Sequence, residues 1–209
     1  KLFDSTGATD LPQTRSLFGV VNLETGTIDV KVELDREKYF GEGIAILNDQ
    51  IFQLTYRSKT GFVYQLETFE KLREFTIPSK EGWGLTTDGK SLIMSDGTDQ
   101  LTYLDPVSLI VTKKVSAREN GAAKARLNEL EYANGFIYAN VWMTNEIVKI
   151  NPKDGNVVGK IDLTEFAKDA KSTFPNSLEM NGIAFHPKRK SFFITGKLWP
   201  KIYEIRIPI

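Results

Sequence analysis

The stretch FGEGIAILNDQIFQLTY, residues 40–56, decides the fold of this chain. It contains two apolar segments joined by the turn formers Asn48 and Asp49, the pattern of a β-hairpin. Three later stretches repeat the pattern: GWGLTTDGKSLIMSD, LNELEYANGFIYANVW and MNGIAFHPKRKSFFITGK. The sequence therefore predicts four related hairpins, with strands over 40–47 and 51–56, 82–87 and 92–96, 127–132 and 136–142, and 180–185 and 192–197.

Further short apolar segments follow each hairpin, and the whole unit recurs with a period of about 40 residues. A repeat of four short strands at that spacing is typical of β-propeller blades. No long amphipathic helix separates the strands, which argues against a parallel α/β fold. The sequence thus predicts an all-β chain that forms a five-bladed β-propeller.

We expect a single propeller domain over 1–209, with blades near 1–35, 36–77, 78–117, 118–163 and 179–209. Residues 164–178 are expected to form a loop with a short helix over 164–170, which Thr164 caps. The first blade lacks its innermost strand and the last blade its outermost strand. We therefore expect a native segment upstream of Lys1 that supplies the missing innermost strand.

The composition excludes several classes of function. The chain has 209 residues with 27 basic and 27 acidic side chains, so its formal net charge is zero and no nucleic-acid partner is indicated. No apolar run is long enough to span a membrane. There is no Cys and only one His, His186, which excludes disulfides, thiol catalysis and a His-rich metal site. We expect neither a metal nor a cofactor.

Candidate site residues come from aligning the innermost strands on their shared apolar position, which is Ile44, Leu85, Leu130 and Ile183. Two residues earlier stand Glu42, Trp83, Asn128 and Asn181. Equivalent positions in a propeller are related by rotation about the central axis, so these side chains are expected to converge near the channel. The second strands end with Tyr56, Asp96, Trp142 and Lys197, expected near one rim. Aromatic walls around a few polar groups are typical of a ligand pocket. The alternatives are a water-lined channel and aromatic packing between blades.

These same strings, together with QLTYRSKTGFVY and TGKLWPKIYEI, resemble the plant-type glutaminyl-peptide cyclotransferases, which also occur in bacteria. The resemblance runs in register from Phe3 to Ile207. It implies a five-bladed propeller that converts N-terminal glutamine into pyroglutamate and releases ammonia without a metal. The residues that match the family's site are Glu42 as the catalytic carboxylate, Asn128 as a substrate-binding amide, Phe40, Trp83 and Trp142 as aromatic walls, and Lys197 nearby.

Two positions depart from the family pattern. The family motif QLTW is QLTY here, so Tyr56 replaces a pocket Trp and adds a hydroxyl group. The family's first innermost strand, with its FTQGL motif, is absent from this chain. Tyr56 and Asn181 complete the set of expected substrate-binding residues.

The chemistry suits such a site. The α-amine must attack the side-chain amide carbon, so the enzyme must first hold the folded conformer of glutamine. One proton leaves the amine and one must reach the departing nitrogen, and a single carboxyl group such as that of Glu42 can relay both. Lys197 is a candidate for stabilising the developing oxyanion.

The favoured interpretation is therefore an acyltransferase-class glutaminyl cyclase acting on peptides with N-terminal glutamine, or on free glutamine. The first alternative is a non-catalytic propeller that binds peptides or a small ligand through its channel. A propeller glycosidase ranks last, because it needs two carboxylates facing a cleft. We expect a monomer, and the resemblance implies a secreted or periplasmic location.

Overall fold

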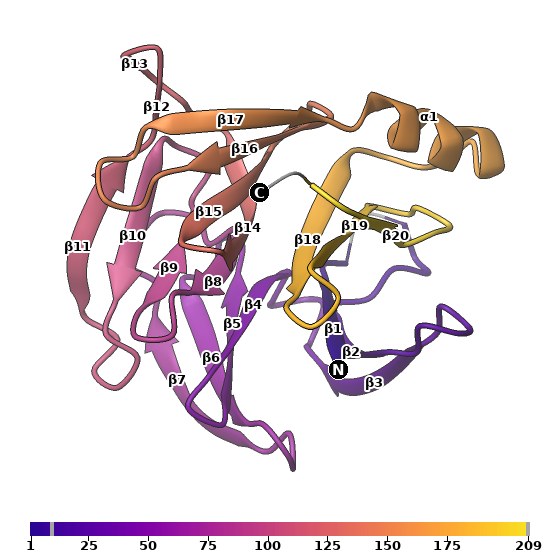
Figure 1. Ribbon diagram of the computed structural model, residues 1–209. Helices are drawn as coiled ribbons and strands as arrows, with labels where there is room; N and C mark the ends of the chain where they lie inside the picture. The colour runs from indigo at the N-terminus through magenta and orange to yellow at the C-terminus, as the bar shows by residue number, and fades with distance from the viewer. Residues whose placement is uncertain (9–10, 208–209) are drawn as a thin grey trace. The chain divides into compact units, whose positions relative to one another are not determined.

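The computed structural model describes residues 1–8 and 11–207 and is nearly all β, with one short helix (Figure 1). Its strands form five antiparallel meanders of three or four strands each, plus one two-stranded hairpin. The chain separates into two compact units. The first comprises Lys1–Asp96 and Thr102–Lys113, and the second Gly97–Leu101 and Lys114–Ile209.

The first unit begins with a three-stranded sheet and continues with a four-stranded one. The first sheet has the order β1(Leu2–Thr6), β2(Leu17–Val21), β3(Ile28–Glu33), and the second β4(Gly41–Leu47), β5(Gln50–Thr55), β6(Thr60–Gln65), β7(Lys71–Thr76). The third sheet is β8(Leu85–Thr87), β9(Leu92–Met94), β10(Gln100–Leu104), β11(Val111–Ser116). Within this unit β4 lies between β1 and β8.

The second unit holds the remaining elements. A hairpin of β12(Arg118–Glu119) and β13(Ala122–Ala123) precedes the sheet β14(Leu127–Ala133), β15(Phe136–Val141), β16(Glu146–Ile150), β17(Val157–Asp162). Then come α1(Thr164–Thr173) and the three-stranded sheet β18(Met180–His186), β19(Ser191–Gly196), β20(Tyr203–Ile205). The first and last sheets have three strands each, as the repeat pattern predicts.

Short turns with left-handed backbone close the hairpins. Asn48 and Asp49 both have positive φ (52° and 58°), and so do Asn134 and Gly135 (52° and 83°). Two successive residues with φ above zero make the type I′ turn, whose twist matches that of the flanking strands. The predicted turns at these two places are therefore confirmed.

The hairpin β12–β13 was not predicted. It turns at Asn120–Gly121, where both φ angles are positive (53° and 84°), and Asn-Gly is the strongest short signal for such a turn. Its strands are only two residues long, which is too short for an alternating pattern to be visible in the sequence.

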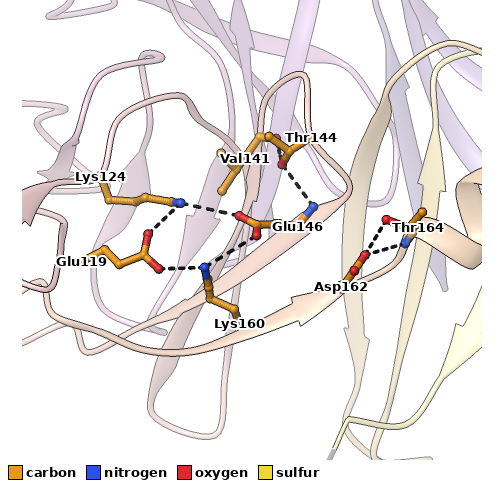
Figure 2. A network of polar contacts seen from close by, with 8 residues as sticks. All are labelled: Glu119, Lys124, Val141, Thr144, Glu146, Lys160, Asp162 and Thr164. Carbon is orange, nitrogen blue, oxygen red and sulfur yellow. Dashed lines mark hydrogen bonds and ion pairs between the residues drawn. The ribbon is translucent and has the colours of Figure 1, made fainter.

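Four alternating charges hold this hairpin against the fourth sheet, as Figure 2 shows. Lys124 lies 2.9 Å from Glu119 and 3.6 Å from Glu146, and Lys160 lies 3.0 Å and 3.6 Å from the same two carboxylates. Each cation thus bridges two anions, an arrangement that contributes more than an isolated surface pair. The network fixes the residues that lead into β14.

Helix α1 is longer at its C-terminal end than the predicted 164–170 and packs against β20. Phe166 meets Tyr203 edge to face at 5.1 Å, and Asp169 accepts hydrogen bonds from Lys201 and Tyr203. The prediction that Thr164 caps the helix is wrong. The N-cap residue is Leu163, and Asp162 Oδ1 binds both the amide and the hydroxyl of Thr164.

Among residues 1–8 and 11–207, no helix has the length and apolar character needed to cross a bilayer.

Apolar clusters fill the space between neighbouring sheets inside each unit. In the first unit one cluster joins the second and third sheets and another joins the first and second; in the second unit a cluster joins the fourth and fifth sheets. Leu54, Tyr138 and Phe192 are fully buried members. The alternating inward residues of each strand thus supply the cores that align adjacent sheets.

Three inner hairpins carry the same irregularity, one extra residue on the inner strand. Between the pairs Gly41↔Thr55 and Ile44↔Gln53, two residues of β4 face only one of β5. The same bulge occurs between Leu127 and Leu130 on β14, and between Met180 and Ile183 on β18. A bulge turns the side chains of its two residues away from the regular alternation. The bulged pairs are Glu42–Gly43, Asn128–Glu129 and Asn181–Gly182.

Backbone groups at the bulges bind the neighbouring sheet of the same unit. Gly43 N donates to Trp83 O at 2.8 Å, and Gly182 N donates to Asn140 Oδ1 at 3.1 Å. A Cβ atom on Gly43 would lie 2.5 Å from Leu85 N and 2.7 Å from Trp83 O. Glycine at position 43 therefore permits the close approach of β4 and the start of β8.

Glu131 on β14 makes a similar link in the second unit. Its Oε1 accepts the amide of Phe185 on β18 at 2.9 Å. Burial raises the pKa of Glu131 to about 8, although the Phe185 hydrogen bond opposes the shift. An inner strand has no partner on one edge, and the carboxylate satisfies an N–H there.

We expect Gly43→Ala to lower the free energy of unfolding by about 1–3 kcal/mol, because the added methyl group would overlap backbone atoms that cannot move aside. Chemical denaturation measures the change. Gly159→Ala is the control, since its Cβ would meet only Lys149 side-chain atoms, the nearest at 3.6 Å. Equal stabilities for the two variants would contradict the close approach at Gly43.

We expect Glu131→Gln to remove a pH dependence of stability. Because the folded-state pKa of Glu131 is raised to about 8 from 4.5, the folded state binds the proton more tightly, and stability falls as pH rises across that window. The neutral amide should make the variant more stable than the wild type above pH 8, by up to about 5 kcal/mol, and nearly equal below pH 4.5. Unfolding free energies measured across this range with identical slopes for both proteins would refute the assignment.

Candidate functional site

In the first unit, two predicted site residues have adjacent backbones. Glu42 occupies the bulge on β4, and its carbonyl oxygen accepts the hydroxyl of Ser5 at 2.6 Å. The next residue, Gly43, donates its amide to the carbonyl of Trp83 at 2.8 Å. Trp83 itself precedes β8, which begins at Leu85 rather than at the predicted residue 82. The bulge thus connects the carboxylate-bearing strand to the segment that carries the indole.

Phe40 and Tyr56 form an aromatic pair in the same unit. They flank β4 and β5, and the amide of Tyr56 donates to the carbonyl of Phe40 at 3.0 Å. Their ring centroids are 5.9 Å apart, and the guanidinium of Arg57 lies 4.5 Å from the centre of the Tyr56 ring. Tyr56 therefore retains the aromatic face expected of the Trp that it replaces.

The indole of Trp83 is held by an acidic residue that sequence reasoning did not select. Its Nε1 donates to Glu81 Oε2 at 3.0 Å, and Arg57 Nε donates to Glu81 Oε1 at 2.9 Å. Each oxygen of the carboxylate therefore has its own donor. The side chains of Tyr56 and Trp83 are linked through this ion pair.

Asp4 on β1 is another carboxyl group that was not predicted. Burial raises its pKa to about 6, and a hydrogen bond from the Ser5 backbone opposes the shift. It lies next in sequence to the residue whose hydroxyl binds the Glu42 carbonyl. A buried carboxyl with a pKa near neutrality is a group to consider in proton transfer.

In the second unit, the two predicted asparagines occupy equivalent bulges. Asn128 is buried in β14, and Asn181 is half-buried in β18. Asn140, fully buried on β15, accepts the amide of Gly182, the residue after Asn181. The Oδ1 of Asn181 and the Nδ2 of Asn140 are buried without a hydrogen-bond partner. Asn140 was not predicted, although it lies in the quoted string LNELEYANGFIYANVW.

Trp142 and Lys197 meet at a second carboxylate that was not predicted, Glu179. Lys197 Nζ lies 2.8 Å from Glu179 Oε1. Burial alone would raise the pKa of Glu179, but hydrogen bonds from the side chains of Lys197 and Trp142 outweigh it and leave the pKa below its usual value. The carboxylate is therefore ionised and binds both an ammonium group and an indole.

The predicted residues thus fall into one group in each unit. Phe40, Glu42, Tyr56 and Trp83 belong to the first unit, and Asn128, Trp142, Asn181 and Lys197 belong to the second. A signal for the two missed carboxylates exists in the repeat alignment. Glu81 and Glu179 both stand four residues before the shared apolar position, Leu85 and Ile183.

Trp199 and His186 make packing or turn contacts within the fold. Trp199 is partly buried and packs against the apolar cluster of the second unit, with its ring centroid 5.8 Å from that of Tyr203, and its Nε1 donates to Leu178 O. His186 ends β18, and its Nδ1 accepts the amide of Arg189. In the part of the chain that the structure describes, no three acidic or imidazole side chains gather in a way that suits a metal ion.

Comparison with known proteins gives consistent matches along the chain. The family model for glutamine cyclotransferase matches residues 1–207. A glutaminyl-peptide cyclotransferase of Arabidopsis thaliana is 40% identical over 207 residues, which are 99% of this chain and 63% of that protein. This chain therefore spans less than two thirds of the length of that relative.

The solved structures agree. The crystal structure of Myxococcus xanthus glutaminyl cyclase has a TM-score of 0.85 and 32% identity, covering 91% of this chain and 82% of the other. Hydrazine synthase of Kuenenia stuttgartiensis shares the fold alone, with a TM-score of 0.52 and 13% identity over 87% of this chain and 49% of the other. The predicted all-β, five-bladed β-propeller fold is confirmed. By the family match along residues 1–207 and the structural match at 32% identity, this chain belongs to the glutamine cyclotransferase family.

Proposed function

We propose that this chain is a glutaminyl-peptide cyclotransferase that cyclises N-terminal glutamine to pyroglutamate and releases ammonia. The observation that carries the proposal is the family match over residues 1–207, in a chain that has a carboxylate, Glu42, at the bulge of its second sheet. A module that only binds peptides has no need of that carboxyl group. In the proposal the chain acts as one propeller domain, with the blade boundaries expected from its repeats.

The reaction requires one bond to form and one to break. The neutral α-amine attacks the side-chain carbonyl carbon and forms the ring C–N bond, and the bond from that carbon to the amide nitrogen then breaks. One proton passes from the attacking amine to the leaving nitrogen, which departs as ammonia. In our proposal Glu42 accepts the first proton and donates it to the leaving group, so it returns to its starting state.

The bulge gives Glu42 a suitable position for this role. Its own carbonyl is bound by Ser5 and the following amide is bound to Trp83, so the backbone under the carboxylate is fixed on both sides. A general acid–base group that is held in place needs little reorganisation during the reaction.

The remaining site residues would bind and orient the substrate. In the proposal Phe40, Tyr56, Trp83 and Trp142 provide aromatic walls for the short glutamine side chain, and the amides of Asn128 and Asn181 orient it. Lys197 has three N–H donors, and one of them binds Glu179. The others remain available to stabilise an oxyanion on the amide carbonyl.

The proposed substrates are peptides with N-terminal glutamine, or free glutamine, and we propose that the chain acts as a monomer without a metal or other cofactor. We also propose a secreted or periplasmic location, which the family resemblance supports. Ammonia release from a Gln-peptide, measured with and without a chelator, tests the activity. Binding of the peptide with no ammonia would instead favour the non-catalytic alternative.

We expect Glu42→Gln to fold normally and to lower kcat by at least about 100-fold, because the amide cannot relay a proton and general acid–base catalysis contributes about that much or more. Ammonia release from a Gln-peptide gives the rate, and circular dichroism checks folding. Glu74→Gln is a matched control, since Glu74 is on β7 of the same sheet and pairs with Lys71 at the surface. A Glu42→Gln variant with wild-type turnover would remove Glu42 from the mechanism.

We expect Trp83→Ala to raise KM by about tenfold or more with only a small loss of stability, because loss of an aromatic wall removes contact with the substrate. Trp199→Ala should show the opposite, a loss of about 1–3 kcal/mol in stability, because the partly buried Trp199 packs against a core cluster. Steady-state kinetics and chemical denaturation of both variants separate the two roles. If Trp83→Ala destabilises the fold and leaves KM unchanged, Trp83 is a packing residue.

A further inference from the structure

We infer that Glu81 and Glu179 are positioning residues that hold the indoles of Trp83 and Trp142 in fixed orientations. The inference rests on the proposed function, because it assigns a task to the walls of that proposed site. It adds two carboxylates, each with a basic partner, to residues that neither the family resemblance nor the repeat analysis selected.

In the first unit the indole N–H of Trp83 and both carboxylate oxygens of Glu81 have hydrogen-bond partners. The single N–H of the Trp83 indole donates to Glu81 Oε2 at 3.0 Å. Arg57 Nε donates to the other oxygen, Oε1, at 2.9 Å. The backbone of Glu81 is also held, because Ser79 Oγ donates to its carbonyl at 2.6 Å. The carboxylate therefore has a fixed backbone, a fixed counter-ion and one remaining oxygen that faces the indole N–H.

The second unit has the same combination of groups. Glu179 lies 2.8 Å from Lys197 Nζ, and a hydrogen bond from the Trp142 side chain is the smallest of the contributions that lower its pKa. Its backbone pairs with the same lysine, since Lys197 N donates to Glu179 O at 3.0 Å. The side chain of Glu179 is only 20% exposed, and that of Lys197 is 35% exposed. Glu179 is thus the more enclosed partner of the ion pair.

The two carboxylates stand at the same place in their repeats, four residues before the apolar position that aligns the inner strands. Glu81 enters the third blade and Glu179 the fifth. One belongs to the first unit and the other to the second, and their basic partners are different residues, Arg57 and Lys197. The same device therefore occurs twice with different components, which argues against a chance surface contact.

A carboxylate partner limits how an indole can move. Tryptophan has one hydrogen-bond donor and a large apolar face, so binding of the N–H leaves the ring plane as the surface offered to a ligand. Hydrogen bonds to charged groups are stronger than neutral ones. A ring that is already oriented loses less conformational freedom when a ligand binds, so its effect appears mainly in affinity.

These carboxylates are positioning residues because their oxygens are engaged by neighbouring side chains of the protein. Both oxygens of Glu81 carry donors, and Glu179 has its pKa lowered by its partners, although burial opposes the shift. Because its pKa is lowered, Glu179 is a poor proton donor near neutral pH. We therefore assign proton transfer to Glu42 and ring orientation to Glu81 and Glu179.

The first test measures hydrogen exchange of the indole Nε1–H groups by NMR in the substrate-free protein. The chain has only three Trp residues, so the signals can be assigned by substitution. We expect Glu81→Ala to accelerate exchange at Trp83 about tenfold or more while Trp142 changes less than about twofold, and Glu179→Ala to do the reverse. Glu81→Gln should restore slow exchange at Trp83, because its side-chain oxygen still accepts the N–H.

The second test is kinetic, with a Gln-peptide as the substrate. We expect Glu81→Ala to raise KM about tenfold and to change kcat less than about threefold, the pattern of lost ground-state binding. Glu179→Ala is assessed by indole exchange alone, because Glu179 also pairs with Lys197, the proposed oxyanion group. Glu33→Ala is the control, because Glu33 is also ion-paired to an arginine, Arg15, on the first sheet. It should leave KM at the wild-type value.

The two tests separate this inference from the proposed function. If the wild-type protein releases no ammonia, the proposed function fails, and indole exchange still decides whether the carboxylates hold the rings. If the wild type is active but the alanine variants keep slow exchange at both indoles, the inference is overturned and the activity stands. Fast exchange at Trp83 in Glu81→Ala with a kcat loss and unchanged KM would also overturn it, because Glu81 would then act in catalysis.

Discussion

The extra residue in the inner hairpins is the constraint on which the rest of this structure depends. A regular antiparallel pair would direct every second side chain to the same face and leave the inner strand uniform. The bulge at Glu42–Gly43 interrupts that order and frees backbone groups to bind the next sheet. The same interruption recurs at Asn128 and Asn181. One local irregularity therefore both aligns neighbouring sheets and sets the orientation of polar side chains.

Carboxyl groups near the inner strands have opposite environments. Glu131 is buried against a backbone amide, and its pKa is raised to about 8. Glu179 is also partly buried, but an ammonium group and an indole bind it, and its pKa is lowered. The two carboxyl groups differ both in depth and in partners: Glu131 is the more deeply buried, and Glu179 has an ammonium partner. Burial disfavours the ionised form and opposite charge favours it. Neighbouring acids in one unit can thus have separate tasks.

Several local features were predictable because local chemistry determines them. The positive φ values at Asn134 and Gly135 follow from the tolerance of Asn and Gly for left-handed backbone. The hairpins follow from alternating apolar residues. The repeat alignment treats Ile44 and Leu130 as equivalent, and each is the first paired residue after the bulge on its strand. The cap at Thr164 could not be read this way, because Asp162 accepts both the amide and the hydroxyl of Thr164, and the carbonyl of Leu163 accepts the amides of Phe166 and Ala167.

The sequence by itself determined the five repeated sheets, their strand order, most of their turns and the family, because these depend on residue spacing and on motifs that can be read along the chain. The short hairpin β12–β13 was the exception. Only the tertiary structure decided which groups the side chains bind. Glu81 meets Arg57, 24 residues away in sequence, and Glu179 meets Lys197 across a hairpin. Such contacts depend on the bulges and on the approach of separate strands. A hydrogen bond requires an atomic distance near 3 Å, and residue spacing along a chain does not specify that distance.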